Sequence, residues 1–134
     1  MIALTHKPHV RSYHQRTMTR TVSYHLHAAV EILGGAAVMA APFALGLGRS
    51  AAIISVVLGA LAIGAALQIG GATRRMALSA HASFDYVLAA VAIFAGLALG
   101  IGAGEWRATV FLVGVGVGQA ALTASTRWSA PASA

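Results

Sequence analysis

Two histidine–acid pairs with the same spacing are the residues of this chain best suited to chemistry. Glu31 follows His27 by four positions, and Asp85 follows His81 by four. Four residues make about one helical turn, so each pair is predicted to share one face of a helix. Imidazole nitrogens and carboxylate oxygens bind zinc, iron and manganese, and they also form hydrogen-bonded pairs and proton relays. These four residues are the candidate site.

The two pairs belong to an internal repeat. They lie 54 residues apart, and the same shift places the segment 44–48 (ALGLG) on 98–102 (ALGIG). Continuing along the helix from Glu31 and from Asp85 gives mostly small residues, which let neighbouring helices approach closely. Each copy of the repeat therefore carries one polar pair on a face that is predicted to pack against protein.

Composition places the chain in a membrane. It is 58% hydrophobic and 9% charged, with a mean hydropathy of +0.78, whereas globular proteins are roughly 25% charged. Ionisable side chains at membrane depth are costly and usually face protein or water, so the two pairs are expected to be buried. The net charge of +6 lies in the arm and the connections, which indicates membrane topology and not binding to nucleic acid.

Four apolar runs predict an all-α integral membrane protein. Each run approaches or exceeds the roughly 20 residues that a helix needs to cross a bilayer, and short links after the first and third runs predict two helical hairpins. The runs are 25–47, 51–70, 80–103 and 107–125. The chain is expected to divide into a flexible basic arm at 1–23, a transmembrane domain at 24–129 made of repeats 24–73 and 78–127, and a tail at 130–134.

The distribution of positive charge predicts the orientation. With the N-terminus inside, seven lysines and arginines are cytoplasmic and only Arg49 and Arg107 lie outside. A repeat unit with an even number of spans returns to its starting side, so the copies are predicted to be parallel about a pseudo-twofold axis along the membrane normal. Glu31 then lies roughly 9 Å into the first helix on the cytoplasmic side, and Gln119 approaches the same level on the last helix. We expect a bacterial inner-membrane protein with both termini in the cytoplasm.

Three roles are open for the cluster of His27, Glu31, His81 and Asp85. The favoured role is structural: each histidine hydrogen-bonds its own acid or the acid of the other repeat, which fixes the register of the two hairpins. The second is a divalent metal site with two imidazole and two carboxylate ligands, decided by the distance between the helices. The third is movement of protons or cations, within one molecule or in a homo-oligomer.

Other chemistry finds little support in the sequence. The chain has no cysteine, which excludes thiolate ligands, disulfides and thiol catalysis. It shows no nucleophile–base–acid set and no phosphate-binding loop, so no enzymatic activity is expected. A haem between His27 and His81 fits poorly beside two carboxylates. The expected partners are the lipid bilayer and further copies of the chain.

A short motif in the first run carries a family resemblance. The segment Ala41-Pro42-Phe43, followed by Leu45-Gly46, closes a glycine-rich helix in a repeated two-helix unit. The chain thereby resembles the SPW-repeat integral membrane proteins of bacteria, with alanine in place of serine and phenylalanine in place of tryptophan. The second copy reads Ala95-Gly96-Leu97 and has no proline. The resemblance implies the four-helix membrane fold over about 25–125 and carries no biochemical activity.

Overall fold

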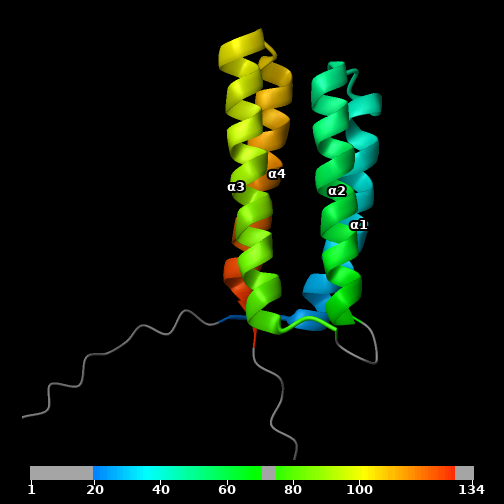
Figure 1. Ribbon diagram of the computed structural model, residues 1–134, viewed down its shortest axis with the longest axis vertical. Coiled ribbons are helices and arrows are strands. Elements are labelled where there is room, and N and C mark those ends of the chain that lie inside the picture. The colour runs from blue at the N-terminus through cyan, green and yellow to red at the C-terminus, as the bar shows by residue number, and fades with distance from the viewer. Residues whose placement is uncertain (1–19, 71–74, 129–134) are drawn as a thin grey trace, which may run out of the picture.

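Two helical hairpins stand side by side in the computed structural model (Figure 1), which describes residues 20–70 and 75–128. The four helices are α1 (Tyr24–Ala44), α2 (Arg49–Gly70), α3 (Leu78–Ala103) and α4 (Trp106–Ser125). All four are long and apolar enough to cross a membrane. The prediction of an all-α, multi-pass membrane protein is confirmed, and each helix begins and ends within three residues of the expected run.

Left-handed glycines end the first helix of each hairpin at the two turns farthest from the described chain ends (Figure 1), called the outer turns, and the opposite end of the bundle is called the inner end. The backbone of Gly46 has φ +61° and that of Gly104 has φ +69°, a conformation that other residues rarely adopt. The first helix ends at Ala44, three residues before the expected boundary at about 47, because Leu45 caps it and Gly46 turns the chain. Both outer turns therefore lie at the end of the bundle opposite to the described chain ends (Figure 1).

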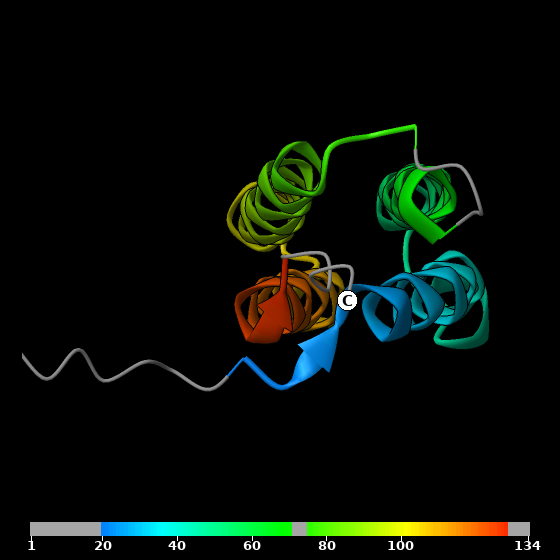
Figure 2. The ribbon, with the colours of Figure 1, turned by 90° about the horizontal axis from the view of Figure 1, so that it is seen from below.

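The helices pack more closely within each hairpin than between the two hairpins. Within each hairpin the helices run together along their length, whereas contact between hairpins is sparser, as the view along the bundle shows (Figure 2). At the inner end, a small apolar core crosses between hairpins and contains Ala28, Ala66, Ile69 and Leu78. A second core lies further along the helices and contains Leu58, Leu88, Ala92 and Leu112. The hairpins are therefore semi-independent units joined at defined places.

A pair of short strands joins the two ends of the helical domain. Strand β1 (Val22–Ser23) runs parallel to β2 (Thr126–Arg127), with Val22 opposite Thr126. Ser23 also caps α1, because its hydroxyl accepts a hydrogen bond from the Leu26 amide at 3.2 Å. The predicted flexible arm at 1–23 is thus wrong in its last residues, which are paired. Residues 1–19 of the arm, the link 71–74 and the tail 130–134 lie outside the described residues.

Candidate metal centre

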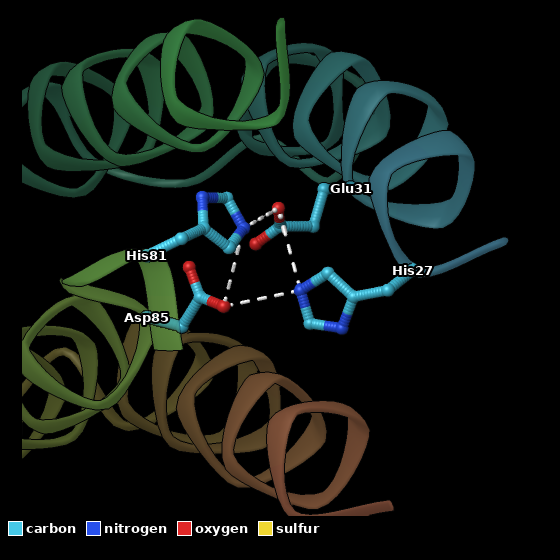
Figure 3. A group of neighbouring side chains, drawn as sticks. All are labelled: His27, Glu31, His81 and Asp85. Carbon is cyan, nitrogen blue, oxygen red and sulfur yellow. Dashed lines mark hydrogen bonds and ion pairs between the residues drawn. The ribbon is translucent and has the colours of Figure 1, made fainter. Parts of the chain in front are cut away.

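Four ionisable side chains meet between the hairpins near their inner end (Figure 3). His27 and Glu31 come from the first turns of α1, and His81 and Asp85 come from the first turns of α3. Both histidines and Asp85 are fully buried, and Glu31 is 2% exposed. The structure therefore brings together all four residues that the repeated spacing singles out.

The shortest contacts in the cluster cross from one hairpin to the other. His27 Nε2 lies 3.0 Å from Asp85 Oδ2, and His81 Nε2 lies 3.0 Å from Glu31 Oε2. Within each helix, the histidine and its own acid are 3.4 Å apart. The matching distances in the two halves reflect the pseudo-twofold repeat, and the crossed contacts tie α1 to α3.

One donor atom from each of the four residues points into a common space. The four atoms all lie within 4.8 Å of one another. A tetrahedral ion with nitrogen and oxygen ligands at 2.0–2.1 Å would have ligand atoms about 3.3 Å apart. The four histidine–carboxylate contacts of 3.0 and 3.4 Å are close to that spacing, while the donor atoms as a set spread over up to 4.8 Å. A tetrahedral ion would therefore draw the opposite corners of this ring of contacts closer together.

Hydrogen bonds from the fourth helix and the strand after it hold the cluster from outside. Gln119 Nε2 donates to Glu31 Oε1, and Thr126 Oγ1 lies 2.9 Å from His27 Nδ1. Second partners of this kind fix the orientation of metal ligands in proteins. His27 and Glu31 therefore each have one partner inside the cluster and a second partner outside it.

The bonds of Thr126 assign the proton on one histidine ring. The Thr126 hydroxyl has a single hydrogen and donates it to the Leu122 carbonyl at 2.7 Å. His27 Nδ1 must then carry a hydrogen and donate it to Thr126 Oγ1. The other nitrogen, Nε2, faces carboxylate oxygens of Asp85 at 3.0 Å and Glu31 at 3.4 Å. An ionised carboxylate only accepts, so either a proton, carried by Nε2 or by a carboxyl oxygen, or a metal ion must lie between Nε2 and these oxygens.

Trp128 covers the inner side of the cluster. Its ring centroid lies 4.7 Å from that of His27 and 5.6 Å from that of His81. The indole Nε1 donates to the Thr123 carbonyl at 3.0 Å, which fixes the ring. Trp128 therefore contacts both imidazoles of the cluster. The indole thus separates the two rings from the inner end of the bundle.

Two polar atoms of the cluster have no hydrogen-bond partner among the described residues. They are Asp85 Oδ1 and His81 Nδ1, and both are buried. Buried polar atoms are nearly always paired with protein, water or an ion, so each exception needs an explanation. Both atoms belong to α3, whereas the corresponding atoms on α1 are bonded to Gln119 and Thr126.

An apolar cavity of about 330 Å³ borders the cluster between the hairpins. Of the four cluster residues only Glu31 lines it, beside Gln119. The remaining lining is apolar and rich in glycine, including Gly34, Gly114 and Gly118. The cluster therefore lies within helices that are long enough to span a membrane, with protein on its other sides and an apolar cavity beside Glu31.

The sequence identifies some of the supporting residues and misses others. Gln119 is expected at this level and is found there. Thr123, which lies 3.5 Å from Asp85 Oδ2, and Thr126 were missed. A threonine in an apolar helix usually bonds its own backbone, as both do here. The only available signal was their position in the sequence, four and seven residues after Gln119.

Comparison with known proteins found no match. No protein-family model matches the chain, and no curated protein and no solved structure matches it.

Proposed function

We propose that this chain is a multi-pass protein of a bacterial inner membrane that binds one divalent metal ion between its hairpins. The ligands are His27, Glu31, His81 and Asp85. The observation that carries the proposal is the convergence of four buried donor atoms within 4.8 Å, two from each hairpin. Two nitrogens and two carboxylate oxygens suit zinc, iron or manganese.

Charge balance supports a divalent ion in this position. The two carboxylates carry two negative charges in a region of low dielectric, where an uncompensated charge is costly. A divalent cation would neutralise both. It would also satisfy the Nε2 lone pair of His27, which faces Asp85 and Glu31 without a hydrogen of its own when the ring is neutral.

Metal content of the purified protein tests the proposal directly. The protein is purified in detergent through a tag without histidine, and bound metal is measured by elemental analysis and by titration with Zn²⁺ and Mn²⁺. We expect close to one ion per chain. The double substitution Glu31→Gln/Asp85→Asn should weaken metal binding by at least about 100-fold. Loss of a residue that only supports a ligand costs about 10- to 100-fold in affinity, and this variant removes the charge of two ligands.

Glu105 provides the matched control for that experiment. It is the third and last acid of the chain and lies at the outer turn before α4. Glu105→Gln should leave the bound metal unchanged. A wild-type protein that is free of metal and binds Zn²⁺ and Mn²⁺ no better than the double variant would overturn the proposal. The crossed contacts would then stand as a link that fixes the register of the hairpins.

The proposed orientation places the cluster and both termini on the cytoplasmic side. It rests on the excess of positive charge at that end and agrees with the resemblance to bacterial SPW-repeat membrane proteins. Because the chain has no cysteine, single cysteines report topology cleanly. Arg49→Cys should react with an impermeant maleimide added to intact cells, and Arg75→Cys only after permeabilisation. The opposite labelling pattern would reverse the orientation.

A further inference from the structure

The two carboxylates of the cluster are held differently. Both oxygens of Glu31 have partners, since Oε2 faces the histidines and Oε1 accepts the amide of Gln119. Asp85 faces the histidines through Oδ2 alone, and its Oδ1 is buried without a partner among the described residues. Both oxygens of one carboxylate thus have partners, whereas the other carboxylate has a buried oxygen without one among the described residues.

The second helices of the hairpins correspond with a shift of 57 residues instead of 54. A Cβ on Gly59 would meet the Gly35 carbonyl and Met39, while one on Gly116 would meet the Ala89 carbonyl and Ile93. Gly35 and Met39 lie 54 residues before Ala89 and Ile93, whereas Gly59 lies 57 before Gly116. The second hairpin therefore has three more residues than the first between the contact on its first helix and the contact on its second helix. This agrees with the greater length of α3 compared with α1.

This correspondence explains why α3 lacks the outer partners that α1 has. The position on α2 that corresponds to Gln119 is Ala62, and the position that corresponds to Thr126 is Ile69. Neither side chain can donate or accept a hydrogen bond. In a symmetric arrangement these two positions would face Asp85 Oδ1 and His81 Nδ1, the two cluster atoms that lack a hydrogen-bond partner among the described residues.

We infer that the metal site has five protein donor atoms, with Asp85 binding through both carboxylate oxygens and Glu31 through one. This inference rests on the proposed metal function. Gln119 is the positioning residue that keeps Glu31 to one oxygen. The alanine at position 62 leaves Asp85 free to use two, and the bound cation compensates the buried Oδ1. A fifth donor favours ions that accept higher coordination numbers over strictly tetrahedral ones.

Cobalt reports the coordination number without any activity assay. The detergent-purified protein is loaded with Co²⁺, and its visible absorption and X-ray absorption pre-edge are recorded. Four-coordinate tetrahedral Co²⁺ gives intense bands, and each added ligand weakens them. We expect the weaker spectrum of five-coordinate Co²⁺ in the wild-type protein. A tetrahedral wild-type spectrum would overturn the inference, even if no variant could be purified.

A pair of isosteric substitutions then separates the two carboxylates. Asp85→Asn leaves a single oxygen donor, because an amide nitrogen has no free lone pair to offer, so the bands should intensify as the number falls to four. Glu31→Gln should leave the coordination number unchanged, because the Gln119 amide can rotate and accept from the new amide group. Equal changes in the two variants would overturn the inference.

Gln119→Leu provides the third variant. Without the amide, Glu31 Oε1 is free to bind as well, so the Co²⁺ bands should weaken below those of the wild type. Glu105→Gln, a substitution at the outer turn away from the cluster, should leave their intensity unchanged. Unaltered bands in Gln119→Leu would count against its positioning role. Failure of the wild-type protein to take up Co²⁺ at all would instead contradict the proposed metal function.

Discussion

Asp85→Ala, measured in the presence of a chelator, is expected to lower the free energy of unfolding by about 3 kcal/mol. The substitution deprives His27 Nε2 of its shortest contact, at 3.0 Å, and leaves a single carboxylate buried with two histidines. Removing one member of a buried ion pair costs more than removing the whole set, because the remaining charges lose their compensation. Steric trapping or forced unfolding in bicelles gives the measurement.

A quadruple variant supplies the control for that effect. Leucine at both histidines, methionine in place of Glu31 and alanine in place of Asp85 keep the total volume close to the original and remove every charge of the cluster. This variant should be more stable than Asp85→Ala alone. A quadruple variant that is less stable than the single one would mean that the hydrogen bonds themselves, and not the balance of charge, stabilise the contact between hairpins.

Gly116→Ala is expected to destabilise the second hairpin by about 1–3 kcal/mol. A Cβ at this position would lie 2.5 Å from the Ala89 carbonyl oxygen and 2.6 Å from Ile93 Cγ1. The carbonyl belongs to the backbone of α3 and cannot rotate away, so the two helices must separate. Such close approach at small residues is a main source of helix association in membranes.

Neighbouring glycines on the same helix are the controls. A Cβ on Gly114 or on Gly118 would meet nothing within 4 Å. Alanine there should be neutral or slightly stabilising, because alanine favours helix more than glycine does. The difference between Gly116→Ala and Gly118→Ala, measured by thermal unfolding in one detergent, isolates the steric term. Equal effects at the two positions would contradict the packing described for α3 and α4.

Much of the fold could be predicted from the sequence because the apolar runs are long and the links short. The repeated His–acid spacing also identified the four residues of the cluster. The crossed pairing could not be decided in advance, because a helical spacing of four permits His27 to bond either Glu31 or Asp85. That choice depends on the distance between α1 and α3, which is set by the packing of whole hairpins.

The remaining differences have similar causes. Strands of two residues, such as Val22–Ser23, carry no periodic pattern, so their pairing with Thr126 and Arg127 was missed. The shift of 57 in the second helices was also hidden, because the segments that match by sequence lie near the outer turns. It became visible only through the backbone contacts of Gly59 and Gly116.

The cluster is divided equally between two hairpins, and neither hairpin holds more than half of it. A single repeat would need to find an identical partner by diffusion, and the resulting dimer would have two equivalent halves. Covalent fusion replaces that encounter with an effective concentration that is millimolar for short linkers. Fusion also allows the two halves to differ in sequence, so one copy can have alanine at residue 62 while the other has glutamine at residue 119. The asymmetry of the site is a freedom that a dimer of identical chains does not have.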